Sequence, residues 1–373
     1  MYAGCNYKPG RVLGLYPMRG DSSAYYRLAV PLSTLESAGW AHFEDVTYDQ
    51  LKAAETVVIA RLGGTPDDVA AFMADLRQRY GVRRVLVDFD DAMFSYQPVV
   101  EVRPAPMALE GVRYALAHAD GVIVQNAALR SYYEAYTDAP IHVLPNFVRL
   151  EDYPAQPPAA AWPPVVTLAG SPSHGADWLS VVPALRWLRQ NAPDVRLRVF
   201  GCPLAEIKEL ATEYYEWSSP TVYMQRLEGT SIGLCPLPFT EFNACKSAIK
   251  AVEYALAAGA AVIGSPTQYA PLLAGGRGFV VPDGDVNGWA RCIAWYLTNP
   301  DVRAAHAAAL RAHVIATRDV RRYADQIASI YEGGTEHVAS DGHGWAHPGG
   351  AEQRADHDRE DHRDHARAAD RGH

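Results

Sequence analysis

The chain has few cysteines, no excess of positive charge and no long apolar run. Its five cysteines are an odd number without metal-ligand spacing, which argues against a disulfide framework or a structural zinc and favours reduced thiols. The formal net charge of -9 gives no overall attraction to nucleic acid. No apolar run approaches the ~20 residues that span a bilayer, and the N-terminus lacks a basic stretch followed by an apolar one. We therefore expect a cytoplasmic protein without a membrane span.

What the sequence contains is an alternation of short apolar runs and helical patterns. With 373 residues, of which 49% are hydrophobic, the chain is long enough for two domains with separate cores. The alternation predicts an α/β fold with two parallel, doubly wound sheets. The predicted strands of the first half lie at 11–17, 56–60, 84–89, 121–126 and 141–146, and those of the second half at 165–170, 196–201, 221–225, 231–238, 260–265 and 278–281. A loop and an amphipathic helix that ends at Gly39 are expected after the first strand.

Composition suggests where the domains begin and end. Residues 153–164 are rich in Pro and have no periodicity, so they are the expected linker. From Gly333 onward His, Asp and Arg replace large apolar residues, which predicts disorder. The predicted organisation is an N-terminal Rossmann-like domain at 1–152, the linker at 153–164, a C-terminal Rossmann-like domain at 165–317, a helix at 318–332 and a disordered tail at 333–373.

The most informative stretch runs from Asn243 to Ser265, NACKSAIKAVEYALAAGAAVIGS. It predicts a helix with Asn243 as N-cap and Gly259 at its end, followed by a buried strand. The apolar stripe of the helix consists of Cys245, Ile249, Val252 and Leu256. A neighbouring stripe, open to a ligand, holds Lys246, Lys250 and Glu253. Two lysines near the positive end of a helix dipole are unfavourable unless an anion such as a diphosphate binds there, although solvated lysines are the alternative.

This stretch resembles the donor-binding domain of GT-B glycosyltransferases, in particular the retaining family 4, or group 1. The family pattern K-x-x-E-Y-x-A-x-G-x-P-V-I-x-S corresponds here to Lys250, Glu253, Tyr254, Gly259, Val262, Ile263 and Ser265, with Ala261 in place of the usual Pro. The resemblance continues through Gln268, Tyr269, Gly278 and Val280 to VPDGDVNGWA. It implies a GT-B fold with two facing Rossmann-like domains, an acceptor domain at 1–152 and a nucleotide-sugar donor domain at 165–317. It also implies that the C-terminal helix at 318–332 crosses back to the first domain.

The resemblance also implies roles for individual residues. Glu253 would accept hydrogen bonds from the donor ribose, and Lys246 and Lys250 would face its diphosphate. Family members often carry an earlier Glu near the sugar, and Cys245 stands at that position.

The turn that follows the strand at 165–170 is a second candidate contact with the donor. Ser171, Ser173 and His174 stand there in place of the family's Arg and Lys, as in related bacterial and phage glycosyltransferase-like proteins. Ser171 and His174 are therefore predicted donor contacts, with capping of the next helix as the alternative for His174.

Two further clusters follow strands of the first half. Gly20, Ser22, Ser23 and Arg27 occupy the position of a GT-B loop close to the donor, or form an ordinary βα turn with a serine N-cap. The second cluster is Asp88, Asp90 and Asp91. Three carboxylates cannot all be buried and ionised without compensation, so they are solvated, paired with basic groups or functional.

We predict that Asp90, Asp91 and Lys250 are catalytic. Either aspartate could orient the attacking hydroxyl or stabilise positive charge on the sugar. Asp88-Phe89-Asp90 also satisfies D-x-D, the metal-binding signature of GT-A enzymes, which leaves a metal site as the alternative. The resemblance to GT-B proteins predicts neither a metal nor another cofactor.

The predicted function is a hexosyl- or other glycosyltransferase reaction. A sugar would move from a nucleoside-diphosphate sugar to a hydroxyl acceptor, with retention implied by the resemblance. The acceptor stays open between a glycan, a protein, a small metabolite and modified DNA. Two alternatives remain: an inactive GT-B module that binds nucleotide sugars, and a phage-type transferase that acts on a hydroxymethylated DNA base.

Overall fold

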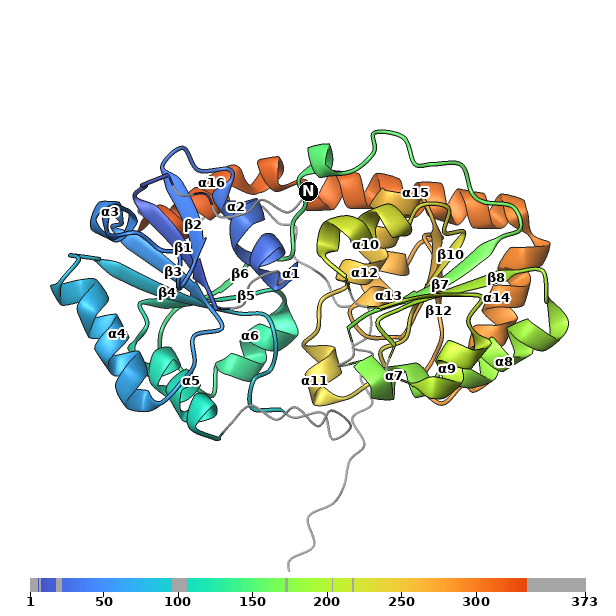
Figure 1. Cartoon of the computed structure of the whole chain (residues 1–373), viewed down its shortest axis with the longest axis horizontal. Coiled ribbons are helices and arrows are strands. Elements are labelled where there is room, and N and C mark those ends of the chain that lie inside the picture. Colours follow the sequence, from blue (N-terminus) through green and yellow to red (C-terminus); the bar gives the residue numbers. More distant parts are fainter. Residues whose placement is uncertain are drawn as a thin grey trace, which may run out of the picture. The chain divides into compact units, whose positions relative to one another are not determined.

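The computed structural model describes residues 6, 8–17, 22–95, 106–171, 174–202, 204–216 and 218–333 (Figure 1). Gly20, Ser173 and the predicted tail after Gly333 lie outside the described residues. In the part that is described, no helix combines the length and apolar character needed to cross a bilayer.

The first half is built on a six-stranded parallel sheet with the order β2-β1-β3-β4-β5-β6. Its strands are β1 (Val12–Tyr16), β2 (Ala38–His42), β3 (Thr56–Ala60), β4 (Arg84–Phe89), β5 (Gly121–Val124) and β6 (Ile141–Val143). Alternate side chains enter different cores, since Val57 and Ile59 join one apolar cluster while Val58 and Ala60 join another. Both faces of the sheet are therefore covered, as parallel sheets require.

Helices of the first half begin at residues suited to cap them. Thr47 forms a capping box with Gln50, Thr65 accepts a hydrogen bond from the backbone of Asp68, and Asn126 from that of Leu129. The helical segments are α1 (Ser22–Ala24), the π-helical η1 (Tyr25–Ala29), α2 (Val30–Leu32), α3 (Tyr48–Ala53), α4 (Pro66–Gln78), α5 (Pro106–His118), α6 (Ala127–Tyr133) and the 3-10 segment η2 (Leu150–Asp152).

The second half repeats this architecture with the order β12-β11-β10-β7-β8-β9, again in parallel. Its strands are β7 (Val165–Ala169), β8 (Arg196–Phe200), β9 (Glu213–Tyr215), β10 (Ile232–Cys235), β11 (Ala261–Gly264) and β12 (Phe279–Val280). Its helices are α7 (Gly175–Leu179), α8 (Val182–Asn191), α9 (Ala205–Leu210), α10 (Pro220–Arg226), α11 (Glu241–Ala244), α12 (Ile249–Glu253), the π-helical η4 (Tyr254–Ala258), α13 (Tyr269–Leu273), α14 (Gly288–Thr298) and α15 (Pro300–Arg318).

The last helical segments return to the first half, as the predicted crossover requires. They are the 3-10 segment η5 (Val320–Tyr323), α16 (Ala324–Ala328) and the π-helical η6 (Ser329–Gly333). Figure 1 shows α16 close to α2, and the Arg84 guanidinium donates to the carbonyl of Ile330 at 3.0 Å. One apolar cluster contains buried side chains of both halves and of these segments, including Tyr26, Val252 and Ile327.

Three local predictions are wrong. Gly39 lies inside β2 and does not end a helix; a Cβ on it would come within 2.4 Å of the carbonyl oxygen of Lys8, so the close backbone explains the glycine. Residues 221–225 form part of α10 rather than a strand, because Pro220 opens a helix. The predicted helix from Arg318 is interrupted, since α15 ends there and Asp319 caps the next segment.

The predicted helix from Asn243 to Gly259 is also broken. Thr240 caps α11 by accepting a hydrogen bond from the backbone of Asn243, so Asn243 is not the N-cap. A second helix begins at Ile249 and widens into η4. Gly259 ends it with φ 61°, the left-handed conformation expected of a terminal glycine.

Candidate functional site

Both sheets change their strand order at a defined point. In the first sheet this point lies between β1 and β3, and in the second between β7 and β10. Ligands of open parallel sheets bind at the carboxyl ends of the strands beside such points. The loops after these four strands are therefore the place where site residues are expected.

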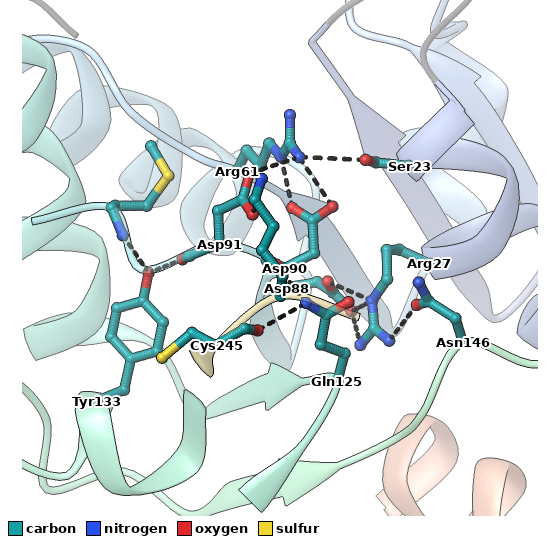
Figure 2. A network of polar contacts seen from close by, with 12 residues as sticks. Ser23, Arg27, Arg61, Asp88, Asp90, Asp91, Gln125, Tyr133, Asn146 and Cys245 are labelled. Carbon is teal, nitrogen blue, oxygen red and sulfur yellow. Dashed lines mark hydrogen bonds and ion pairs between the residues drawn. The ribbon is translucent and has the colours of Figure 1, made fainter. Parts of the chain in front are cut away.

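Arg61 joins the loops of the first sheet (Figure 2). Its guanidinium donates to both carboxylate oxygens of Asp90, at 2.5 and 2.8 Å, to Asp91 at 3.3 Å and to the hydroxyl of Ser23 at 3.1 Å. Arg61 also has φ 49°, an uncommon conformation for a residue other than glycine and one that clusters at functional sites. Arg61 is not among the residues predicted from the sequence, although an arginine directly after the apolar run at 56–60 is a usable signal.

Asp90 and Asp91 are paired rather than solvated. Asp90 is 8% exposed, and burial alone would raise its pKa, but the Arg61 guanidinium more than offsets this and holds the pKa of Asp90 below its ordinary value. The Lys246 ammonium lies 2.8 Å from the carboxylate of Asp91. A residue of the second half thus completes the carboxylate cluster of the first.

Arg27, a predicted contact of the donor, is instead buried in an ion pair. Arg27 is 2% exposed and its guanidinium donates to both oxygens of Asp88, with shortest distances of 2.9 Å, and to the side-chain oxygen of Asn146 at 3.1 Å (Figure 2). Burial raises the pKa of Asp88 to about 6, against the opposing effect of the guanidinium. Arg27 and Asp88 form a buried ion pair below the Arg61 cluster. Ser22, the other residue of this group, begins α1.

Side chains of the first half hold the segment around Cys245. Gln125 donates to the carbonyl oxygens of Asp90 and Cys245 at 2.6 and 3.0 Å, and Asn126 to those of Cys245 and Lys246 at 3.0 and 3.2 Å. Cys245 is buried in the apolar core of the first half, which agrees with the prediction that it faces a core. These bonds fix the position of Lys246 beside Asp91.

Glu253 is 2% exposed, so the prediction that it lies on a stripe open to a ligand is wrong. Its carboxylate accepts hydrogen bonds from the hydroxyls of Tyr26 at 2.9 Å and Tyr223 at 3.1 Å, and from the Lys250 ammonium at 2.9 Å. Tyr26 belongs to η1 of the first half and Tyr223 to α10 of the second. The carboxylate therefore connects the two halves of the chain.

π-helical segments lie on both sides of this connection, because Glu253 directly precedes η4 and its partner Tyr26 belongs to η1. Relative to the family pattern, the chain has one additional residue between Glu253 and Gly259, and the wider turn of η4 accommodates it. Tyr26 lies in the π-helical η1. π-helical turns are rare and are often found at functional sites.

The loop after β7 forms a separate group. The imidazole Nδ1 of His174 lies 2.8 Å from the carboxylate of Asp177, and Asn243 donates to the other oxygen of Asp177 at 2.7 Å. The backbone carbonyl of Ser171 accepts from the backbone of His174 at 3.1 Å. His174 stands at the N-cap position of α7, but its side chain makes no capping hydrogen bond.

Most of the predicted site residues thus fall into three groups. Ser23, Asp90 and Asp91 contact Arg61, and Lys246 joins them through Asp91. Lys250 lies with Glu253, and Ser171 and His174 lie at the end of β7. Over the described ranges, no three His, Cys, Asp or Glu side chains are grouped as metal ligands would be. A pocket of about 160 Å³ near the ends of β10, β11 and β12 contains none of these residues; Pro238, Ser265, Val281 and Trp289 are among those that line it.

A family model and several solved structures resemble this chain. Residues 182–329 match the model of a family described as glycosyl transferase-like. Sucrose-phosphate synthase from Thermosynechococcus elongatus is similar in structure, with a TM-score of 0.61 and 16% identity over 87% of this chain and 98% of that protein. Anabaena HepE in complex with UDP aligns with a TM-score of 0.59 and 16% identity over 87% of this chain and 100% of HepE.

S. aureus TarM aligns with a TM-score of 0.56 and 12% identity over 75% of this chain. The alignment spans 55% of the length of TarM. No curated protein matches the sequence. At these identities the structural likeness establishes the fold, which is the GT-B fold that the sequence resemblance predicted.

Proposed function

We propose that this chain, a protein of the GT-B glycosyltransferase type, moves a sugar from a nucleoside-diphosphate sugar to a hydroxyl acceptor. The observation that carries the proposal is the contact between Lys246 and Asp91. It brings an acid that follows β4 of one sheet to a base that follows β10 of the other. Acidic and basic groups from both sheets are thereby available to one reacting centre, as a transfer between a donor and an acceptor requires.

In the proposed reaction the bond between the anomeric carbon and the diphosphate oxygen breaks, and its electron pair leaves with the diphosphate. The acceptor oxygen bonds to the anomeric carbon on the same face, and its proton passes to the departing diphosphate, so that the configuration is retained. Lys246 and Lys250 would stabilise the charge that develops on the diphosphate. Asp90 and Asp91 would stabilise the positive charge on the sugar or orient the hydroxyl.

The ion pairs described above suggest an order of events. Lys246 is paired with Asp91 and Lys250 with Glu253, so each cation already has an anionic partner. An ammonium has three hydrogen-bond donors and can hold a phosphate oxygen as well as a carboxylate. A diphosphate oxygen bound by Lys246 would weaken the attraction between Lys246 and Asp91 and so make this carboxylate more available to the acceptor. We propose that the reaction needs neither a metal nor another cofactor.

The first experiment is a thermal-shift screen against UDP-, GDP-, ADP- and dTDP-sugars. UDP-glucose is the first candidate, because HepE, which is similar in structure, was solved with UDP-glucose. A ligand at about 100 times its Kd adds roughly 2.7 kcal/mol to the stability of the folded state. Stabilisation by one nucleotide sugar together with release of the nucleoside diphosphate supports the proposal, and the absence of stabilisation by all four sugars contradicts it.

A second candidate function is a module that binds nucleotide sugars without transferring them. It is favoured by Cys245 at the position of the family's earlier Glu and by the burial of Glu253. Such a module would be stabilised by a donor but would release no nucleoside diphosphate with any acceptor in a panel of glycans, proteins, metabolites and hydroxymethylated DNA. Measured turnover with one acceptor would exclude this candidate and identify the acceptor class.

A further inference from the structure

A buried carboxylate links the loops that follow β7 and β10. Asp177 in α7 is 3% exposed at its side chain, and its two oxygens contact Nδ1 of His174 and the amide of Asn243. Asn243 is fully buried and also donates to the carbonyl of Pro238 at 2.8 Å, in the loop after β10. Because β7 and β10 are the neighbours at which the strand order reverses, the group lies at the switch point of the second sheet.

These contacts determine how the imidazole of His174 is oriented. An ionised carboxylate only accepts hydrogen bonds, so Nδ1 carries the hydrogen that faces Asp177. On the other side the ring packs against the end of β7, where a Cβ on Gly170 would come within 3.2 Å of its Cδ2. A second hydrogen bond to Asp177, from Asn243, restricts the carboxylate in turn.

The remaining ring nitrogen of His174 is available to a ligand. None of the described residues makes a hydrogen bond with Nε2, and the side chain of His174 is 22% exposed. A ring that is fixed through one nitrogen presents the other in a defined direction, which is how carboxylates orient catalytic and metal-binding histidines.

We infer that Asp177 and Asn243 are positioning residues that hold His174 as a cationic hydrogen-bond donor to the diphosphate of the sugar donor. The inference rests on the proposed function. The diphosphate would lie on the side of the ring opposite the carboxylate of Asp177, so that Nδ1 donates to Asp177 and Nε2 donates to a phosphate oxygen. His174 would thus supply the charge that this turn lacks, because it contains neither an arginine nor a lysine.

The test compares a nucleoside diphosphate with its nucleoside, since only the first carries the proposed partner of His174. Affinities for UDP and uridine, or for the matching pair if another base is preferred, are measured by ligand-observed NMR titration. His174→Gln and Asp177→Asn should each weaken UDP binding by at least about tenfold and leave uridine binding unchanged. The double variant should lose no more than the more affected single variant, because both remove one interaction. His118→Gln, at an exposed histidine of α5, is the matched control and should change neither affinity.

The outcomes separate this inference from the proposed function. If the wild-type chain binds no nucleoside diphosphate, both fall. If it binds UDP and His174→Gln binds equally well, only the role of His174 falls. A parallel loss of uridine binding would overturn the inference by showing a structural role, and an unchanged UDP affinity in Asp177→Asn would overturn the positioning role of Asp177. Should Asp177→Asn fail to fold, His174→Gln, at a partly exposed side chain, decides the question alone.

Discussion

The buried position of Glu253 leads to a prediction about stability without any ligand. Glu253→Gln preserves the shape of the side chain and removes its charge. Two tyrosine hydroxyls and the Lys250 ammonium would lose a charged acceptor. We therefore expect the substitution to weaken the folded state itself, whereas a glutamate that only contacts a bound ribose would leave the unliganded protein unchanged.

The size of the effect follows from burial and from the number of bonds. Hydrogen bonds to charged groups contribute about 1.5–3 kcal/mol each, and the amide oxygen of glutamine retains part of two of them. Removing one partner of a fully buried ion pair costs about 3–5 kcal/mol. The Lys250 side chain is 19% exposed, so water compensates part of that loss. We expect Glu253→Gln to lower the free energy of unfolding by about 2–4 kcal/mol.

Differential scanning calorimetry and urea unfolding would measure this change, because calorimetry also reports whether the two halves unfold together. Glu216→Gln is the matched control, since its contact with Lys208 is 4.0 Å long and 79% of its side chain is exposed. The control should stay within about 0.5 kcal/mol of the wild type. Tyr26→Phe, which removes only the hydroxyl from the first half, should cost about 1–2 kcal/mol. A Glu253→Gln variant as stable as the control would refute the reasoning and leave the carboxylate available to the ribose.

Three other predictions concern the carboxylates and Lys250. Asp90→Asn or Asp91→Asn should cut kcat at least tenfold, about 1.4 kcal/mol, with little change in donor affinity, and full activity of both variants would contradict a catalytic role. Excess EDTA should leave wild-type activity intact, and loss of activity in EDTA would contradict the metal-independent reaction. Lys250→Ala should reduce turnover more than donor binding, because charge on the diphosphate grows in the transition state. Equal losses of turnover and of donor binding in steady-state kinetics would indicate that Lys250 contributes to ground-state binding only. Because the pKa of Asp88 is raised to about 6, the folded state binds this proton more tightly than the unfolded chain, so Asp88 makes stability rise as the pH falls from about 7 to 4. The Tm of the wild type minus the Tm of Asp88→Asn should therefore increase from pH 7 to pH 5. A decrease in this difference would show that Arg27 keeps the carboxyl of Asp88 ionised.

Much of the architecture could be predicted from the sequence because it depends on local patterns. The apolar runs at 56–60 and 84–89 became β3 and β4, since buried parallel strands need continuous apolar side chains. Gly259 ends its helix because glycine adopts positive φ without strain. Local patterns failed where a distant segment intervenes, as at Gly39, where the backbone of Lys8 requires a residue without a side chain.

The pairing of site residues was decided by the tertiary structure alone. Arg61 reaches Asp90 only because β3 and β4 are neighbours, and Tyr26 reaches Glu253 only because the helices of the two halves pack together. Burial of Glu253 then depends on side chains more than two hundred positions away, which no spacing in its own helix records. The sequence by itself determined where most of the strands lie and which fold they resemble. Only the tertiary structure, within the first half and between the two halves, decided which charges are paired, because a pair of opposite charges is stable in the interior only when both partners lie within hydrogen-bonding geometry.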